Sequence, residues 1–320
     1  MSRKPAQALF WKNRLAILEI ETYLALVDEH FPGLLPHDRQ KIGVNTDGWD
    51  SLVLDIEDAY IFRFPRRPEI KAGYLKEAAL LPGLARALPV SLPVFEFLCL
   101  DDADYRRCFV GYHKIRGVPW SADLAETPHL ERHLAGFLSD LHRFPPDLAV
   151  RLLGLRADPH QWRQGYLEFY AQIQKDAFPL LEEPARRKAA QVWGAFLQDE
   201  ANFSFLPSLI HADLCADHIL CDLECQRVSG IIDWEDATLG DPALDFVGLA
   251  YIAGWGLVER ILSAYQGIVD AGFRRRIAFY LQAIPFHQIL FGLHTNDQNQ
   301  IREGIFILSR LQDRQEESPW

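Results

Sequence analysis

The sequence predicts an α+β protein with two lobes, a small β-rich lobe followed by a larger, mostly helical one. Between residues 40 and 114, short runs rich in β-branched and aromatic residues alternate with turn residues, which is typical of antiparallel sheets. From Gly117 onward, apolar residues recur mainly at helical spacing, and short hairpins over 209–236 interrupt this pattern. With 320 residues, the chain is long enough for one large domain or for two lobes.

The elements of the first lobe follow from these patterns in order. A helix is predicted over 7–30, where apolar residues recur at roughly helical spacing until Pro32 and Gly33 end it. Pro68 suits the first turn of a second helix, which we expect to run to about Ala87. The predicted strands are 41–44, 51–54, 60–64, 94–99 and 107–114.

Composition indicates a globular protein and narrows the class of partner. Hydrophobic residues make up 49% and charged residues 24% of the chain, which are ordinary values. The formal net charge of −11 disfavours nonspecific binding to nucleic acid and suits cationic small molecules. Five cysteines, an odd number, favour reduced thiols in the cytoplasm. Because the longest apolar run, Phe246–Val258, is shorter than the roughly 20 residues that span a bilayer, we expect no membrane partner.

The segment 209–246 carries the densest chemical signal. Asp213 follows His211 by two residues and precedes His218 by five, and Asp233 comes after a short apolar hairpin. In phosphoryl-transfer enzymes of the kinase type, an aspartate accepts the proton of the substrate hydroxyl, and further ligands hold metal ions on the nucleotide phosphates. The order and spacing therefore predict Asp213 as the base, with His211 beside it, and His218 and Asp233 as metal ligands.

Two sequences in this segment resemble the aminoglycoside phosphotransferase family, which are small-molecule kinases built on the protein-kinase plan. They are HADLCADHILCD at 211–222 and IIDWEDATLGDPALDF at 231–246. The first is most similar to the 2''-phosphotransferase branch, where His also occupies the second ligand position, and both resemble macrolide phosphotransferases. YIFRFPRR, GYHKIRGVP and FLSDLH extend the resemblance. It implies a bilobal kinase-like fold, ATP or GTP as phosphoryl donor, and Mg²⁺, with Mn²⁺ as an alternative.

The resemblance also implies domain boundaries. We expect a nucleotide-binding lobe over 1–108, a hinge over 109–117, and a helical lobe over 118–320 that carries the catalytic loop and the acceptor site. The backbone of the hinge would hydrogen-bond the purine. The hinge candidates are Tyr112, His113 and Lys114.

The loop between the first two strands would cover the nucleotide phosphates, through Gly48, Trp49 and Ser51. Small residues permit close approach of backbone N–H groups to an anion. Arg63 stands where the 2'' branch usually has Lys, and Glu77 stands where its helix partner belongs. Arginine keeps the charge but not the geometry. The alternative is that Arg63 and Glu77 form a surface ion pair worth about 0–1 kcal/mol.

His218 is an unusual ligand, since Mg²⁺ prefers oxygen and imidazole suits softer metals. Direct ligation, ligation through water and tolerance of Mn²⁺ all remain open. Because only neutral imidazole ligates a metal, activity is expected to fall as the pH drops through about 6.5. His211 is expected to brace the loop, while Asp241 and Asp245 follow the family pattern that ties a helix to the catalytic loop.

The acceptor is less well defined by the sequence. Aminoglycosides are polycations, so carboxylates near Asp233 are candidates for binding them. The 2'' branch has an acidic stretch after its DPxxDF, but here VGLAYIAGWGLVER is uncharged until Glu259. Such a lining suits a macrolide or another apolar alcohol, unless the stretch is simply a core helix. The substrate candidates are Glu235, Asp236, Tyr251, Trp255 and Asp297.

Two other functional classes stay open, along with a zinc site. His211, Asp213, Asp217, His218 and Asp233 are also ligand types of a metal-dependent hydrolase. Three cysteines in the same region, Cys215, Cys221 and Cys225, could hold zinc, but neither set has the paired spacing of a specific motif. A nucleotide-binding pseudokinase is the third alternative. For the kinase, we expect a monomer whose partners are a nucleoside triphosphate and a small alcohol, without nucleic acid.

Overall fold

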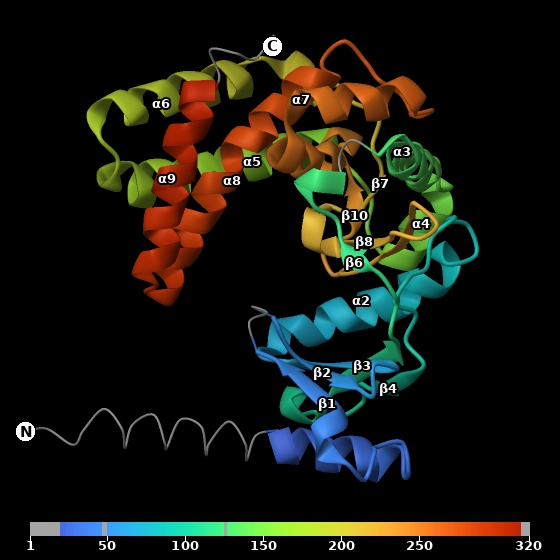
Figure 1. The fold of residues 1–320 in the computed structure, drawn as a ribbon. Helices are drawn as coiled ribbons and strands as arrows, with labels where there is room; N and C mark the ends of the chain where they lie inside the picture. Colours follow the sequence, from blue (N-terminus) through green and yellow to red (C-terminus); the bar gives the residue numbers. More distant parts are fainter. Residues whose placement is uncertain (1–19, 47–49, 125–126, 315–320) are drawn as a thin grey trace, which may run out of the picture. The chain divides into compact units, whose positions relative to one another are not determined.

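The computed structural model describes residues 20–46, 50–124 and 127–314. The chain divides into two compact units, which are considered separately (Figure 1). Unit 1 comprises Met1–Ala85 and Leu92–Ile115, and unit 2 comprises Arg86–Ser91 and Arg116–Trp320. The last change of unit, after Ile115, falls within the predicted hinge 109–117, whereas the passage of 86–91 into unit 2 was not predicted.

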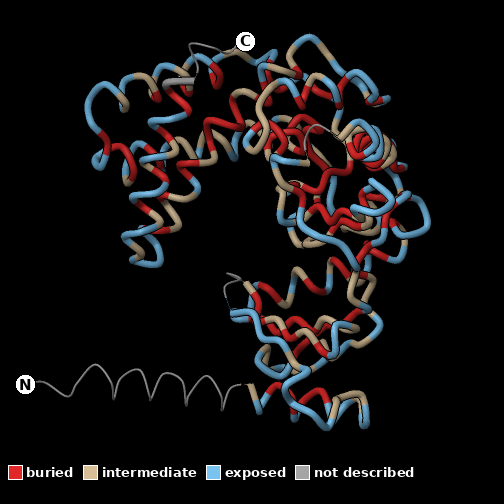
Figure 2. The backbone as a smooth tube through the Cα atoms, in the orientation of Figure 1, coloured by how far each residue is buried: buried red, intermediate tan, exposed pale blue. Residues whose placement is uncertain are grey.

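Unit 1 is built on a five-stranded antiparallel sheet with the order β1-β2-β3-β5-β4. Its strands and helix are β1 (Ile42–Asn45), β2 (Ser51–Ile56), β3 (Tyr60–Pro65), α2 (Pro68–Leu84), β4 (Phe97–Cys99) and β5 (Phe109–His113). A further helical segment covers 20–30, and the rest of the predicted first helix lies outside the described residues. In Figure 2, β2 and β3 are largely buried, whereas the edge strand β1 is exposed.

The two faces of this sheet pack on different helices. Successive side chains of a strand point to opposite faces, so Phe62 and Phe64 face one way and Arg63 the other. The two phenylalanines join a fully buried cluster with Tyr23 of the segment 20–30. Arg63 faces α2 on the other side, where its guanidinium contacts Glu77. The alternation thus places a charged side chain inside unit 1, between sheet and helix.

The predicted strands of unit 1 are confirmed in number and order, with shorter bounds at two of them. β4 begins at Phe97 rather than near Val94, because Pro93 lacks an N–H and the preceding residues form a turn. β5 begins at Phe109 rather than Arg107, because Tyr105–Arg107 forms a 3₁₀ turn capped by the Asp104 side chain.

Unit 2 is mainly helical, as predicted, and contains two small antiparallel sheets. Its helices are α3 (Pro128–His142), α4 (Pro146–Leu153), α5 (Pro159–Gln172), α6 (Glu183–Gln198), α7 (Val247–Ala264), α8 (Phe273–Thr295) and α9 (Gln298–Arg314). Its strands are β6 (Val118–Pro119), β7 (Ser208–Ile210), β8 (Ile219–Asp222), β9 (Arg227–Ile231) and β10 (Thr238–Gly240). β10 pairs with β7, and β6 pairs with the β8–β9 hairpin. The connections of these strands carry the candidate site.

Helix α7 is the most apolar helix of unit 2 and is broken near its middle. Gly254 has φ 73° and ψ −175°, values that leave the helical region and that a glycine adopts without strain. The stretch Pro242–Ala264 is long and apolar enough to pass a composition test for a membrane span, but 44% of its most apolar window is buried inside the protein. We interpret it as a core helix, since it contacts α3 and α8 within unit 2.

Candidate active site

The segment 211–218, which we call the catalytic loop, connects β7 to β8 and is held by Asp245. The Asp245 carboxylate accepts hydrogen bonds from the amides of His211 and Ala212, both at 2.9 Å. Ala212 has a left-handed φ of 69°, which is uncommon for a residue with a side chain. Because Asp245 is fully buried, water does not compete for these bonds. The loop conformation is therefore set by a carboxylate 33 residues further along the chain.

Asp245 is itself held by His142, a residue to which sequence reasoning gave no role. The Nε2 of His142 donates to Asp245 Oδ2 at 3.0 Å, and its Nδ1 accepts from the Tyr265 hydroxyl at 2.7 Å. His142 ends α3 in the sequence FLSDLH, so the resemblance of that stretch was the available signal. A second buried carboxylate, Asp241, caps the turn Pro242–Phe246 and forms an ion pair with Arg276 of α8 at 2.6 Å. The predicted tie between this turn and the loop is present.

His211 is completely buried and positions the loop. Its Nε2 donates to the carbonyl oxygen of Ile232 at 3.0 Å, and its Nδ1 accepts from the amide of Asp213 at 3.3 Å. Burial lowers the pKa of His211 to about 4, so the imidazole is neutral, as both contacts require. Its ring lies 4.7 Å from that of Trp234. The place of His211 in the predicted catalytic pair therefore reflects packing rather than contact with a substrate.

Asp213, His218 and Asp233 converge on one point of unit 2. His218 Nδ1 lies 3.4 Å from Asp213 Oδ2, and His218 Nε2 lies 3.5 Å from Asp233 Oδ2. Asp233 follows β9 and has a left-handed φ of 64°, which turns the chain immediately after the strand. The amide of Ile232 donates to the carbonyl oxygen of His218 at 3.0 Å, so the two loops are joined by backbone as well. The fold therefore brings Asp213, His218 and Asp233 together, although they are separated along the sequence.

The charges of this group depend on one another. Burial acts to lower the pKa of His218, but its hydrogen bond with Cys215 and the charges of Asp233 and Asp213 outweigh this and raise it to about 10. Burial raises the pKa of Asp213 to about 6, and the His218 charge opposes the rise. Since 53% of the Asp213 side chain is exposed, water also limits that rise. Without a metal, His218 is thus an imidazolium between two carboxylates.

The donor set fits a divalent cation through Asp233 and His218. His218 Nδ1 donates to the backbone carbonyl of Asp213 at 2.7 Å, which leaves Nε2 as the nitrogen that can ligate. A carbonyl partner on the other ring nitrogen is the usual arrangement of a metal-binding histidine. Nε2 faces the Asp233 carboxylate, the oxygen ligand that Mg²⁺ prefers. Asp233 would therefore hold the ion, with His218 beside it.

In unit 1, Arg63 and Glu77 form a buried ion pair. Both Glu77 oxygens accept from Arg63 Nη1, at 2.9 and 3.1 Å, and the two side chains are 8% and 0% exposed. The alternative of a surface pair is therefore wrong. The Arg63 guanidinium also lies 5.0 Å from the ring centre of Tyr74, whose hydroxyl bonds Ser51 at 2.6 Å. Gly48 and Trp49 lie outside the described residues.

The three hinge candidates use their side chains within unit 1. His113 pairs with Glu96 at 2.9 Å, and Lys114 pairs with Asp55 and Asp58, both at 2.5 Å. Tyr112 is buried in β5. The amide of Lys114 donates to the carbonyl of Ala59, so this N–H is not available to a purine. The side-chain contacts of these residues therefore stabilise the sheet and do not indicate a ligand-binding site.

Comparison with known proteins identifies the family. A profile of the phosphotransferase enzyme family matches residues 41–279, most of the chain. The chain belongs to the phosphotransferase enzyme family. This membership confirms the predicted class of enzyme, and the phosphotransferase fold explains why a β-rich segment precedes a helical one.

Relatives and solved structures agree with this family. Viomycin phosphotransferase of Streptomyces vinaceus is 26% identical over 198 residues, which cover 60% of this chain and 66% of that protein. The GDP and kanamycin complex of APH(2'')-IIIa is similar in fold, with a TM-score of 0.83 and 24% identity over 92% of this chain and 99% of that chain. Macrolide 2'-phosphotransferase type I has a TM-score of 0.75 and 24% identity over 90% and 96%. The kinase-like fold is thereby confirmed.

The acceptor candidates of this phosphotransferase fall into three groups. Glu235 is half-buried and Asp236 is exposed, and both directly follow the turn at Asp233. In α7, Tyr251 is 44% exposed and Trp255 is partly buried, next to the break at Gly254. Asp297 caps α9 by accepting from the amides of Asn299 and Gln300 at 2.8 and 3.4 Å. The cap gives Asp297 a structural role.

The alternative metal sites are not assembled as the sequence suggested. His211 uses both ring nitrogens inside the loop, which removes it from a hydrolase-type ligand set. Cys221 is buried and Cys225 is exposed, so these cysteines do not share one environment. Among these three cysteines, Cys215 belongs to a cluster of three ligand-type side chains, with Asp213 and His218.

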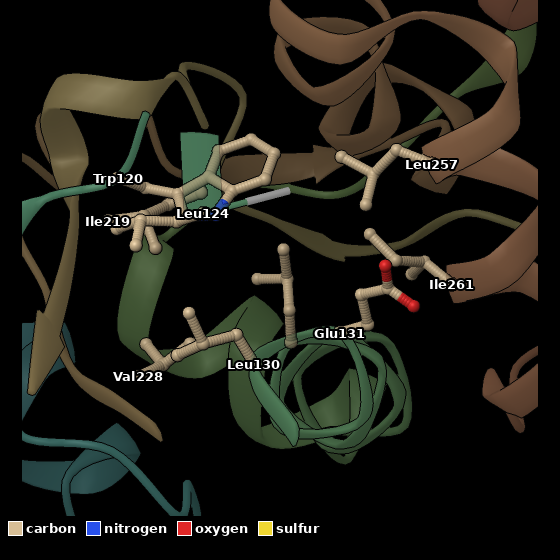
Figure 3. A pocket seen from close by; sticks show the side chains of 9 residues that line it. Trp120, Leu124, Leu130, Glu131, Ile219, Val228, Leu257 and Ile261 are labelled. Atoms are coloured by element: carbon tan, nitrogen blue, oxygen red, sulfur yellow. The ribbon is translucent and has the colours of Figure 1, made fainter. Parts of the chain in front are cut away.

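A small cavity lies next to the catalytic loop, between α3, α7 and the β8–β9 hairpin (Figure 3). Its walls are mainly apolar, with Trp120, Ile219 and Leu257 among them. The Glu131 carboxylate, which Figure 3 shows on α3, accepts from Arg260 Nε at 2.8 Å. Because its carboxylate is paired and its other walls are apolar, we interpret the cavity as a packing gap rather than a substrate site.

Proposed function

We propose that this protein transfers the γ-phosphoryl group of ATP or GTP to a hydroxyl of an antibiotic-like small molecule. The observation that supports it is the convergence of Asp213, His218 and Asp233, with His218 3.4 and 3.5 Å from the two carboxylates. Family membership gives the reaction class. The acceptor and the preferred nucleotide belong to this proposal.

In the proposed mechanism, Asp213 orients the acceptor hydroxyl and takes its proton as the oxygen attacks the γ-phosphorus. The new bond joins the acceptor oxygen to phosphorus, and the bond from phosphorus to the β-phosphate oxygen breaks. Asp233 and His218 would hold Mg²⁺, which supplies charge neutralisation on the phosphates. Asp245 and His211 keep Asp213 in place through the loop backbone. Arg63 would contribute positive charge toward the nucleotide from unit 1.

An aminoglycoside is the first candidate acceptor. APH(2'')-IIIa, whose solved complex contains kanamycin, shares the fold. Glu235 and Asp236 would offer negative charge to a polycation close to Asp233. Viomycin also belongs in the set worth testing, because a viomycin phosphotransferase is a relative of this chain.

A macrolide or another apolar alcohol is the second candidate, and α7 favours it. Its first half is uncharged, and Tyr251 exposes 44% of its surface there. Glu259, where charge resumes, is already paired with Arg274 at 2.7 Å. Exposed apolar area favours an apolar ligand, at roughly 25 cal/mol per Å² buried.

The test is phosphorylation by the purified protein with Mg²⁺, followed by mass spectrometry of the acceptor. ATP and GTP are supplied separately with kanamycin, viomycin, a macrolide and simple alcohols. We expect a phosphorylated product from at least one antibiotic. Binding of nucleotide without product from any acceptor would contradict the proposed activity and favour the pseudokinase. Product from macrolides only would select the second candidate.

A further inference from the structure

Cys215 is a ligand-type side chain in the catalytic loop that the phosphoryl-transfer mechanism does not use. It lies two residues after Asp213 and three before His218. A carboxylate oxygen of Asp213, the sulfur of Cys215 and a ring nitrogen of His218 all lie within 4.8 Å of one another. An oxygen, a sulfur and a nitrogen donor are thus gathered on one short loop.

The spacing of these donors suits a small tetrahedral cation. Zinc–ligand distances of about 2.0–2.3 Å imply separations of roughly 3.3–3.8 Å between neighbouring ligand atoms. Asp213 Oδ2 is 3.4 Å from Nδ1 of His218, and Asp233 Oδ2 is 3.5 Å from Nε2. In a site with Asp213 the ligating nitrogen is therefore Nδ1, which gives up its hydrogen bond to the Asp213 carbonyl, while the ring proton moves to Nε2 and faces Asp233. The Cys215 sulfur lies within 4.8 Å of the other two donor atoms, so it is at most about an ångström beyond the tetrahedral separation.

The loop backbone holds the donors together and leaves them accessible. The amide of Cys215 donates to the carbonyl of Asp213 at 3.0 Å, and the amide of His218 donates to the carbonyl of Cys215 at 3.2 Å. Asp213 is exposed, and Cys215 and His218 are half-buried. A cation from solvent can reach the site through the exposed Asp213 carboxylate.

The chemistry of the donors distinguishes this site from a magnesium site. Thiolate and imidazole are soft ligands that favour Zn²⁺ or Cd²⁺, whereas Mg²⁺ selects oxygen. The Cys215 thiol loses its proton when the metal binds. His218 belongs to both donor sets, so one imidazole cannot serve both cations at the same time.

We propose that Asp213, Cys215 and His218 form a binding site for a thiophilic divalent cation such as Zn²⁺. Occupation of this site removes both the Asp213 carboxylate and the His218 imidazole from phosphoryl transfer, so Zn²⁺ inhibits the enzyme. The binding of Zn²⁺ is independent of the proposed function, and only the inhibition rests on it.

The test of binding uses metal-free protein in a reductant that does not chelate metals. Zn²⁺ is titrated in competition with a chromophoric chelator, and Cd²⁺ is titrated while the ultraviolet charge-transfer absorbance of a cadmium–thiolate bond is followed. We expect one equivalent to bind, with the thiolate band. Cys215→Ser should abolish the band and weaken Zn²⁺ about tenfold or more.

Cys225→Ser is the matched control, since Cys225 is exposed and lies outside the cluster. It should keep both the band and the Zn²⁺ affinity. The proposal is overturned if Cys215→Ser and wild type bind Zn²⁺ equally, or if the band persists in Cys215→Ser. If Cys215→Ser does not fold, Asp213→Asn replaces it: this variant should weaken Zn²⁺ binding and keep the thiolate band, and unchanged affinity would overturn the proposal.

Inhibition is measured separately, with wild type and Cys225→Ser at fixed Mg²⁺ and nucleotide. Both should lose phosphoryl transfer as Zn²⁺ is added and recover it with a chelator. Activity that persists while Zn²⁺ is bound would contradict the inhibitory role. Because the binding titration needs neither nucleotide nor acceptor, failure of the proposed function leaves the binding result readable.

Discussion

Asp213 and His218 share one electrostatic environment, so the state of each depends on its neighbour. The two carboxylates around His218 favour its protonated form, whereas metal ligation requires the neutral form. A cation at Asp233 would replace the charge that the imidazolium supplies when the metal is absent. Binding of the metal should therefore release a proton.

We predict that kcat/KM falls as the pH drops through about 6. Asp213 accepts a proton only as the carboxylate, and its pKa is raised to about 6, so it is protonated below that pH. The requirement for neutral His218 acts in the same direction. The rate should be about tenfold lower at pH 5 than at pH 7, measured with metal and nucleotide kept saturating. A profile that stays flat between pH 7 and pH 5 would contradict Asp213 as the base.

Sequence spacing predicted that Asp213, His218 and Asp233 belong to one site, and the structure brings the three side chains together on two adjacent loops. The spacing could not show that His142 contacts Asp245, because the two residues are 103 positions apart in the sequence. The burial of His211 could not be predicted from the spacing either, since burial depends on packing between segments that are distant in the sequence. The sequence suggested Cys215 as a zinc ligand together with Cys221 and Cys225, rather than with Asp213 and His218.

At the scale of elements, the catalytic loop is packed directly on the start of α7. A Cβ at Gly248 would lie 2.1 Å from the carbonyl oxygen of Leu214 and 3.0 Å from the Cα of Cys215. Only glycine allows the helix to approach the loop so closely. Helix α7 therefore helps to position Asp213, although it carries no catalytic group.

We predict that Gly248→Ala lowers kcat roughly 100-fold, since a displacement of about 1 Å in a catalytic group has an effect of this size. The extra methyl group must push the loop and Asp213 away from α7. Steady-state kinetics on the phosphorylated acceptor would measure the loss, with circular dichroism to check the fold.

Gly256→Ala in the same helix is the control. Its added Cβ would meet only the end of the Arg260 side chain, at 3.4 Å. We expect normal kcat and a gain of about 0.5–1 kcal/mol in stability, because alanine favours the helix. Equal effects of the two substitutions would contradict the close-contact argument.

The ion pair between β3 and α2 has an energetic consequence of its own. Glu77→Ala removes the carboxylate that faces the buried guanidinium of Arg63, which should lower the free energy of unfolding by about 3–5 kcal/mol. Denaturant unfolding would measure the loss. Replacing both residues by apolar side chains should cost less than the single change. A loss below about 1 kcal/mol for Glu77→Ala is the value expected of a surface pair and would contradict the burial.

Element types were largely predictable, because their periodicity is local. The break in α7 could not be predicted, since a glycine in an apolar run is compatible with a continuous helix. Gly254 adopts φ 73° there, which interrupts the helix. The late start of β4 could have been foreseen from Pro93, whose missing N–H disfavours a strand.

At the scale of the whole molecule, binding of metal and nucleotide should stabilise the fold. Mg²⁺-nucleotide at about 100 times its dissociation constant should add about 2.7 kcal/mol to the free energy of unfolding. Thermal unfolding with and without Mg²⁺ measures the metal-dependent part. Asp233→Ala should lose that part, whereas Asp217→Asn, an exposed neighbour in the loop, should keep it. Identical responses of wild type and Asp233→Ala would exclude Asp233 as the ligand.

The α+β class and the family were evident from the sequence, because motifs on both lobes matched one plan. The acceptor was not evident from the sequence, since specificity for the acceptor depends on which side chains of unit 2 remain exposed after packing. Asp297 illustrates this: as a sequence it is a carboxylate near a polar stretch, but in the fold it caps α9. Exposure at Tyr251 and pairing at Glu259 likewise required the structure.

The central claim is that Asp213 serves as the base of a phosphoryl transfer to an acceptor hydroxyl. The most direct measurement is acceptor phosphorylation by wild type, Asp213→Asn and Asp217→Asn, together with their nucleotide affinities. We expect product from wild type and Asp217→Asn, and loss of product with nucleotide binding retained in Asp213→Asn. Turnover by Asp213→Asn at the wild-type rate would contradict the central claim.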